Sequence, residues 1–342
     1  MGLWMLAMGS LIATPSDRVL DALLALVMGV MIGGRLGYCV FYRPSFLWTF
    51  DASFPFWAVL RLNEGGMASH GGIIGVLVAC WWISRGFRTD DGQRIAKAPV
   101  LHITDAVALV APLGLMMGRI ANFINGELLG RIAVQPAAQA ATGEPAPAWS
   151  VRFPQERLSS RAESVEWTPA QEQQYIGLLR DYQLSPAEPE PEVVERMLGM
   201  VQSGSADLAD RIAPLISARH PSQLYQAFAE GIVVLTVVWL VARRRRSPGL
   251  VSAAFLIVYG TGRVVTEFWR LPDAHFAAAN ATDLGGPTPL GLSRGQWLSV
   301  LMVVVGIAML AWRQIKRTEA RYLGWGVQPV PGVSPERSSG AG

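Results

Sequence analysis

The sequence predicts an all-α fold: a polytopic transmembrane helical bundle with an extracytoplasmic insert domain. Three observations predict it. Hydrophobic residues make up 51% of the 342 residues and mean hydropathy is +0.30. Charged residues make up only 16%, against about 25% in soluble domains. Apolar stretches of membrane-spanning length recur along the chain, and one long polar segment interrupts them. The formal net charge of +3 is too small to indicate a nucleic-acid partner.

Six apolar stretches are close to the roughly 20 residues that cross a hydrocarbon core of about 30 Å. They run over 19–42, 66–83, 101–125, 223–242, 249–269 and 290–312. The apolar opening, Met1 to Ala13, is shorter. At about 1.5 Å per helical residue it would reach only about 20 Å, so we expect a stub rather than a span. It lacks the basic start and cleavage site of a secretory signal.

Basic residues in the short loops predict the orientation, because such loops stay cytoplasmic. Three sets alternate correctly to share one side: the arginines and the lysine of 85–97, Arg243 to Arg246, and the basic residues of 313–321. The long segment 132–220 therefore faces outward. It carries 12 acidic and 7 basic residues, no lysine, and a Pro-Glu cluster, AEPEPE. This composition predicts a soluble, partly irregular insert.

The predicted organisation follows from these boundaries. It comprises the stub 1–18 as the remnant of a missing first span, the first half of the membrane core 19–131, the insert 132–218, the second half of the core 219–313, and a largely disordered cytoplasmic tail 314–342. The two cysteines, Cys39 and Cys80, lie in apolar runs. They suggest neither a disulfide framework nor a thiolate metal site.

Ionisable residues inside the spans are the candidates for chemistry, because each costs about 2.5 to 3.5 kcal/mol at mid-bilayer on insertion scales. They are Arg35, His70, Asp105, Arg119, Glu230, Arg263 and Glu267. Arg119 and Asn122 share a helical face, and Tyr259, Arg263 and Glu267 repeat at a spacing of four. Two helices thus offer an arginine toward the outer half of the membrane. Guanidinium groups match phosphate oxygens, which phospholipid headgroups supply. Composition alone stops at a lipid-handling or anion-translocating membrane protein.

Longer motifs carry a resemblance. The segment GRIANFINGELLGR, from Gly118 to Arg131, closely resembles the signature motif of the bacterial prolipoprotein diacylglyceryl transferase family. Further blocks resemble the same family in the same order. They are GGRLGYCVFY from Gly33, GGMASHGGIIG from Gly65, RHPSQLYQAFAEG from Arg219, YGTGRVVTEFWRLPDAHF from Tyr259, and SRGQWLSVLM from Ser293. Together they cover about 19–131 and 219–312, almost all of the membrane-embedded sequence.

The resemblance implies a multi-pass enzyme of the bacterial inner membrane whose active site faces the periplasm. It implies transfer of the diacylglyceryl group of phosphatidylglycerol to the thiol of the lipobox cysteine in a preprolipoprotein signal peptide, with release of glycerol phosphate. This is the first step of lipoprotein maturation. Its partners would be phosphatidylglycerol, preprolipoproteins and the surrounding membrane lipids, and it would need no metal or nucleotide.

The resemblance also implies the site residues. Catalytic roles fall on His70, Arg119, Tyr259, Arg263 and Glu267, and phosphatidylglycerol binding falls on Arg119, Asn122, Asn125, Glu127, Gly130, His220 and Arg263. His70 would be the base that favours the substrate thiolate, or would orient it. The two arginines would hold the lipid phosphate. Glu267 would orient Arg263, and Asn122 and Tyr259 would donate hydrogen bonds.

Several alternatives stay open. His70 in its Gly-rich turn could be a structural histidine, and Arg119 could be a structural partner of Glu267 or Asp105. Arg35 fits a structural role about as well as a functional one. We expect Asp105 and Glu230 to be helix-start or packing groups rather than catalysts. At the level of the whole chain, the alternatives are a phosphate-lipid transporter or flippase, and an inactive homologue. The second arises because the family begins with a further span, which contributes a tyrosine-containing motif to the site.

Overall fold

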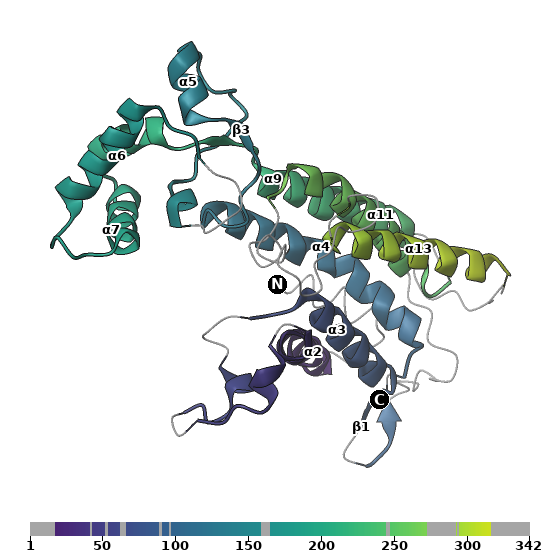
Figure 1. Ribbon diagram of the computed structural model, residues 1–342. Helices are drawn as coiled ribbons and strands as arrows, with labels where there is room; N and C mark the ends of the chain where they lie inside the picture. Colours follow the sequence, from purple (N-terminus) through teal and green to yellow (C-terminus); the bar gives the residue numbers. More distant parts are fainter. Residues whose placement is uncertain are drawn as a thin grey trace, which may run out of the picture. The chain divides into compact units, whose positions relative to one another are not determined.

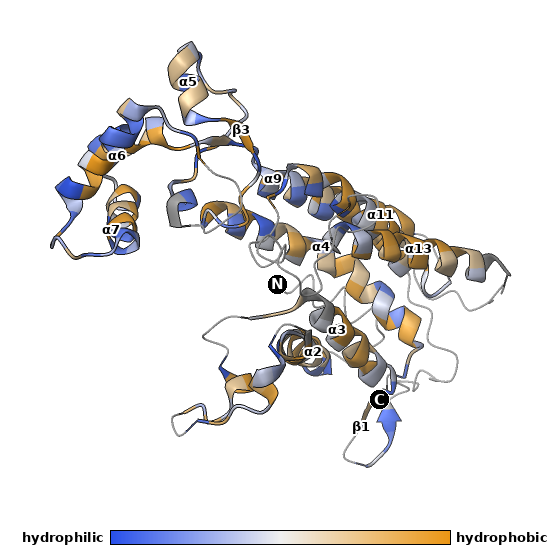
Figure 2. Cartoon of the chain, in the orientation of Figure 1, coloured by the Kyte–Doolittle hydropathy of each residue, from blue (hydrophilic) through white to orange (hydrophobic). Residues whose placement is uncertain are grey.

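The computed structural model describes residues 18–41, 43–51, 54–61, 66–88, 91–95, 97–158, 165–243, 247–271, 292 and 294–315. Within these ranges the chain is mostly helical, which confirms the all-α prediction (Figure 1). Five helices of the described part are long and apolar enough to cross a membrane. They are α2 (Val19–Phe41), α4 (Val100–Ile124), the continuous helix Ser222–Ala242, α11 (Leu250–Thr266) extended by η8 (Glu267–Trp269), and α13 (Arg294–Ile315). Figure 2 shows their apolar character, and the chain is a multi-pass membrane protein.

The second predicted span is shorter than expected. Helix α3 covers Ser69–Ser84, only 16 residues, or about 24 Å at 1.5 Å per residue. The apolar run begins earlier, at Gly66, but Gly66 has a φ of +83° and Ala68 is extended, so the helix starts only at Ser69. The expected full span over 66–83 is therefore wrong in length. The predicted stub 1–18 and tail 314–342 lie almost entirely outside the described residues.

The structure divides into two compact units, which we describe separately. Unit 1 comprises Met1–Val110, Val237–Phe255 and Gly306–Gly342. Its central contact is the pairing of α2 with α3 along facing glycines. A Cβ atom at Gly71 would overlap the carbonyl oxygen of Gly33, and one at Gly75 would overlap that of Gly29. The two backbones therefore approach as closely as small residues allow in membrane helices.

The remaining elements of unit 1 are short. Two 3₁₀ turns, η2 (Pro44–Leu47) and η3 (Ala58–Leu60), follow α2. A small antiparallel hairpin, β1 (Phe87–Arg88) with β2 (Arg94–Ile95), lies between α3 and α4 in the sequence. It contains most of the positively charged loop that the sequence assigns to the cytoplasm.

Unit 2 comprises Ala111–Thr236 and Leu256–Val305. It contains the polar segment, in which β3 (Ile132–Val134) pairs antiparallel with β4 (Ala218–Arg219). This pairing brings the two ends of the segment together. Between them lie α5 (Pro136–Thr142), η5 (Pro154–Leu158), α6 (Pro169–Tyr182), α7 (Glu190–Gln202), α8 (Ala206–Ile212) and η6 (Ala213–Leu215).

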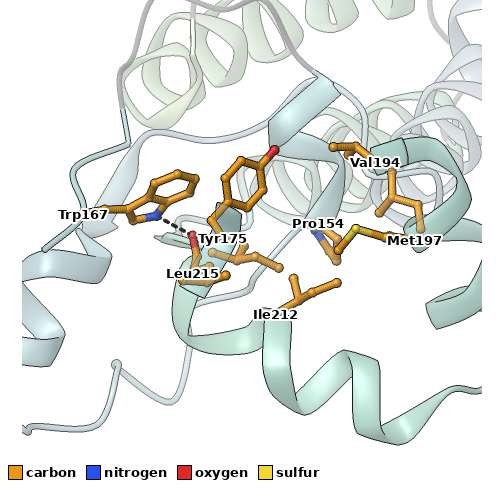
Figure 3. Close-up of a pocket in the computed structure, with 9 residues that line it drawn as sticks. Pro154, Trp167, Tyr175, Val194, Met197, Ile212 and Leu215 are labelled. Atoms are coloured by element: carbon orange, nitrogen blue, oxygen red, sulfur yellow. Dashed lines mark hydrogen bonds between the residues drawn. The ribbon is translucent and has the colours of Figure 1, made fainter. Parts of the chain in front are cut away.

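The insert has its own hydrophobic core. The buried core residues are Tyr175, Leu178, Val193, Met197, Leu208 and Leu215. Figure 3 shows an apolar pocket beside this core, where Trp167 Nε1 donates a hydrogen bond of 2.9 Å to the Leu215 carbonyl oxygen. The Pro-Glu cluster that suggested irregular chain contains the start of α7: Pro191 lies in its first turn with Glu190 and Glu192. Proline and acidic residues both favour a helix N-terminus.

Candidate active site

A buried carboxylate, Glu230, lies at the centre of the candidate site. It belongs to η7 (Ala227–Val233), a π-helical segment between α9 (Ser222–Gln226) and α10 (Val234–Ala242) in one continuous helix. The Glu230 side chain is 0% exposed. A buried charge must be paired, because desolvation would otherwise make its ionised form very unfavourable. Its partners therefore define the site.

Two arginines from two other helices pair with Glu230. Arg119 of α4 donates hydrogen bonds from Nε and Nη2 to Oε2, at 3.3 and 3.2 Å. Arg263 of α11 donates from Nη1 to Oε1, at 3.3 Å. Both arginine side chains are largely buried, at 16% and 14% exposed. The carboxylate of Glu230 therefore holds the two cations in one place, with one oxygen facing each of them.

The ion network continues along α11 and η8. Arg263 Nη2 lies 3.0 Å from Glu267 Oε2, and Glu267 Oε1 lies 3.4 Å from Arg270 Nη1. Both Glu267 and Arg270 are nearly buried. The network of Arg119, Glu230, Arg263, Glu267 and Arg270 thus has three cations and two anions, and we call it the arginine network. Its net charge of +1 at low exposure favours an anionic guest.

The arginine network unites several of the residues predicted from the sequence. Arg119, Arg263 and Glu267 belong to it, and the expected contact between Glu267 and Arg263 is present. Tyr259 lies one turn before Arg263, within electrostatic range of Glu230 and both arginines. Asn122 lies one turn beyond Arg119 on α4 and is half-buried.

One expectation and one alternative about pairing are not borne out. Glu230 is neither a helix-start nor a packing group, since it lies within its helix and carries both arginines. Arg119 pairs with Glu230 rather than with Glu267 or Asp105. Spacing along one helix identifies neighbours on that helix, but the register between helices decides which charges meet across them.

Asp105 instead fixes the start of α11. Its carboxylate accepts hydrogen bonds from the backbone N–H of Gly249 and of Ser252, both at 2.7 Å, and from the Ser252 hydroxyl at 2.6 Å. The structural interpretation of Asp105 is therefore confirmed, because these are the donors that a helix N-terminus leaves unpaired.

Arg35 also has a structural role. Its guanidinium donates four hydrogen bonds to backbone carbonyl oxygens, those of Ala58, Val59, Arg61 and Gly66, at 2.7 to 3.1 Å. The residue is 3% exposed. It ties residues 58–61 and Gly66 to α2, so of the two interpretations the structural one holds.

The end of the signature motif forms a tight loop after α4. Asn125 and Glu127 are exposed there, with Asn125 Nδ2 donating to Glu127 Oε1 at 3.5 Å. Gly130 lies where this loop meets the chain around β4, and a Cβ atom would overlap the carbonyl oxygen of His220. Gly130 therefore has a packing reason to be glycine. Any contact of these three residues with lipid stays a prediction.

His220 follows β4 and stacks on Trp149, with ring centroids 4.6 Å apart and an interplanar angle of 23°. Its backbone N–H donates to the carbonyl oxygen of Arg131 at 3.0 Å. Burial lowers the pKa of the His220 imidazole, because desolvation penalises the charged form. The side chain is thus a partly buried ring at the end of the insert.

His70 is the second residue of α3, in unit 1. Its side chain lies outside the described residues, so its role as a base stays a prediction. Sequence reasoning missed Arg270 and Gln226 as members or neighbours of the site. The spacing of four between Gln226 and Glu230 was the signal available for the second. Within the described ranges, no three His, Cys, Asp or Glu side chains cluster as metal ligands would.

Comparison with known proteins identifies the family of the chain. A sequence model of the prolipoprotein diacylglyceryl transferase family matches residues 2–312. A phosphatidylglycerol–prolipoprotein diacylglyceryl transferase of Bdellovibrio bacteriovorus is 38% identical over 298 residues, covering 83% of this chain and 77% of that protein. One of Ralstonia pickettii is 36% identical over 292 residues, covering 85% and 76%. The chain therefore belongs to the prolipoprotein diacylglyceryl transferase family.

Proposed function

We propose that this protein is a transferase that moves the diacylglyceryl group of phosphatidylglycerol to the lipobox cysteine of preprolipoproteins. The names of its relatives state the lipid, the group and the prolipoprotein acceptor. The arginine network supports the proposal. In it, two arginines from two helices pair with one buried carboxylate, and the network as a whole has a net positive charge. That arrangement suits a lipid phosphate.

The reaction forms a carbon–sulfur bond, breaks a carbon–oxygen bond and transfers the thiol proton. The cysteine sulfur attacks the glyceryl carbon that bears the phosphate and forms a thioether, and the bond from that carbon to the phosphate oxygen breaks. The thiol proton leaves to a base, and glycerol phosphate departs with the electron pair. Negative charge therefore grows on the phosphate in the transition state, where preorganised cations contribute most.

The arginines keep donors for this purpose. Glu230 accepts from Nε and Nη2 of Arg119, which leaves Nη1 for a phosphate oxygen among the bonds of the described residues. Arg263 donates from Nη1 to Glu230, and its Nη2 forms an ion pair with Glu267 at 3.0 Å. Its Nε therefore has no partner among the residues that the structure describes. Each guanidinium is thus held by a carboxylate on one side, and such fixed donors need no reorganisation when the phosphate charge grows.

The other assignments follow the resemblance. His70 accepts the thiol proton, Tyr259 and Asn122 donate hydrogen bonds, and Glu267 orients Arg263. Asn125, Glu127, Gly130 and His220 contribute to the phosphatidylglycerol site. We place the enzyme in the bacterial inner membrane with its site facing the periplasm, since the lipid enters from the bilayer and the signal peptide arrives from the outer side.

The test is transfer by the purified protein. A lipobox peptide is incubated with the protein in phosphatidylglycerol micelles, and the thioether product is measured by mass spectrometry. Arg119→Ala and Arg263→Ala should each lower the rate at least about 100-fold, the effect typical of one lost donor at a developing charge. The lysine variants should rescue poorly, because ammonium lacks the planar fork of guanidinium.

Arg180→Ala is the matched control, since Arg180 is exposed on α6 of the insert. It should retain the wild-type rate. Removal of one member of a buried ion pair also destabilises a fold, so the melting temperature of each variant is measured beside its rate. Wild-type protein that binds phosphatidylglycerol but yields no thioether would contradict the proposal and favour a lipid transporter or an inactive homologue.

A further inference from the structure

A stripe of fully buried polar side chains runs along the helix that carries Glu230. Ser222, Gln223, Gln226 and Glu230 are each 0% exposed. Residues three or four apart lie on one face of a helix, so the four form a continuous polar line that leads from the start of α9 to the arginine network. Buried polar groups are normally hydrogen-bonded, and their partners can therefore be traced one by one.

Three of the four side chains have partners. Gln223 Nε2 donates to the carbonyl oxygen of Glu127 at 2.6 Å, and Ser222 Oγ donates to that of Leu128 at 3.4 Å. Glu230 holds the two arginines. Ser222 and Gln223 are thus bonded to the signature loop after α4, and Glu230 is bonded to the two arginines.

Gln226 differs from Gln223, whose Nε2 is bonded and whose Oε1 alone has no hydrogen-bond partner among the described residues. Neither Oε1 nor Nε2 of Gln226 has a hydrogen-bond partner within the part of the chain that the structure describes. An acceptor and a donor of the same amide are thus both buried and unsatisfied, one helical turn from Glu230. A buried donor or acceptor without a hydrogen bond costs free energy, so the position is suited to a ligand that can both donate and accept hydrogen bonds.

The chemistry of phosphatidylglycerol supplies that ligand. A phosphate oxygen and an ester carbonyl only accept hydrogen bonds, and an ammonium headgroup only donates. A hydroxyl does both, and the terminal glycerol of this headgroup carries two hydroxyls next to the phosphate. A phosphate on the arginine network would place this glycerol within about one helical turn of the phosphate site, which is the separation of Gln226 from Glu230.

We propose that the Gln226 amide binds the terminal glycerol of phosphatidylglycerol and so selects this headgroup. The proposal rests on the proposed function and adds to it a specificity residue. The glycerol leaves with the phosphate, so the amide holds the leaving group and not the diacylglyceryl part. Gln226 should accordingly discriminate between headgroups without affecting the choice of acyl chains.

The test compares two lipids and two glutamines. Phosphatidylpropanol has a three-carbon headgroup without hydroxyls and keeps the phosphate. Wild type should prefer phosphatidylglycerol to it in kcat/KM by at least about tenfold, the loss expected when a buried amide finds no partner. Gln226→Met, which has a similar volume and no amide, should reduce that preference to within about threefold by losing activity only on phosphatidylglycerol.

Gln223→Met is the matched control, because Gln223 is equally buried on the same helix but is bonded to the backbone of Glu127. It should lower activity on both lipids by one common factor and keep the preference. An equal loss on both lipids for Gln226→Met, or no loss on either, overturns the proposal and leaves the amide with a packing role or a buried water. If Gln226→Met does not fold, Gln226→Asn, with its shorter amide, should also reduce the preference.

The two proposals fail separately. Transfer by wild type with an unchanged preference in the Gln226 variants contradicts only the headgroup contact. Absence of transfer by wild type contradicts the proposed function, and the contact is then measured as binding. Fluorescent phosphatidylglycerol bound to wild type should be displaced about tenfold better by phosphatidylglycerol than by phosphatidylpropanol. Equal displacement by the two lipids would overturn the headgroup contact.

Discussion

Glu230 is the residue on which the candidate site depends. The guanidinium groups of Arg119 and Arg263 are both positive and repel one another. The negative carboxylate of Glu230 attracts both and so keeps them together in a poorly solvated place. A buried ion pair adds little net stability when it is complete, but removing one partner leaves an uncompensated charge. The charge of Glu230 should therefore matter more than its volume.

Glu230→Gln keeps the shape and removes the charge. We expect this variant to lose about 3 to 5 kcal/mol of unfolding free energy, as for broken buried ion pairs, and to lose most of the transfer activity. The measurements are thermal unfolding in detergent and thioether formation. Glu195→Gln, an exposed carboxylate on α7, makes the same charge change and should alter neither. Wild-type stability in Glu230→Gln would show that the arginines do not need this anion.

His70 is the second residue whose chemistry can be separated from its structure. If it accepts the thiol proton, His70→Gln should lose about 10² to 10⁴-fold of the rate near neutral pH, because an amide is no base. The deficit should shrink as pH rises toward the thiol pKa of about 8.5, where hydroxide forms the thiolate. The pH–rate profile with one lipobox peptide tests this. Parallel profiles with a loss below about tenfold would assign the base elsewhere.

At the scale of elements, the π-helical segment η7 explains how one helix both holds Glu230 in the site and packs closely against α4. A π turn inserts an extra residue into an α-helix and shifts the faces on either side of it, and such turns are frequent at functional sites. Here the segment covers Ala227–Val233 and contains Glu230. Close packing fixes its position, since a Cβ atom at Gly231 would overlap the side chain of Met116 on α4.

The α2–α3 pair shows what glycine contributes to a helix contact. Gly75→Ala should destabilise the protein by about 1 to 3 kcal/mol, because its new methyl group meets the Gly29 backbone, and overpacking of this kind costs that much. Gly72→Ala on the same helix is the control. Its nearest neighbour atom would lie 3.8 Å away, so the better helix propensity of alanine should make it neutral or stabilising. Thermal unfolding measures both, and equal effects would contradict the packing argument.

Hydropathy predicted the long helices well because burial in lipid requires length and apolarity, and both can be counted along a sequence. It failed at the start of α3, where Gly66 and Ala68 are apolar but not helical. In the insert, the proline and glutamates near Glu190 suggested irregular chain by their composition, but they start a helix. Composition does not distinguish irregular chain from the start of a helix, whereas the position of proline within the first turn does.

For the whole molecule, the limit of prediction lies between helices. The resemblance supplied Arg119, Arg263 and Glu267. In the structure Arg263 pairs with Glu267, and Arg119 pairs with Glu230. The resemblance did not supply Glu230 as the residue that joins them, because no spacing relates position 119 to position 230 or 263. Only the packing of three helices in unit 2 brings these side chains together. The register of one helix against another cannot be counted along a single sequence.

The orientation of the whole chain is the last prediction. Short loops rich in arginine stay cytoplasmic, so the insert should face the periplasm, where a secreted prolipoprotein can reach the arginine network. Gln173→Cys places a thiol on an exposed position of α6, and Gln93→Cys places one in the loop between β1 and β2. The native Cys39 and Cys80 are both buried, and they are replaced by alanine so that each variant has a single thiol. In spheroplasts, a membrane-impermeant maleimide should label Gln173→Cys and leave Gln93→Cys unlabelled, whereas a permeant maleimide should label both. Labelling of Gln93→Cys alone by the impermeant reagent would place the insert in the cytoplasm, away from any secreted substrate, and would contradict the proposed route of the acceptor cysteine to the site.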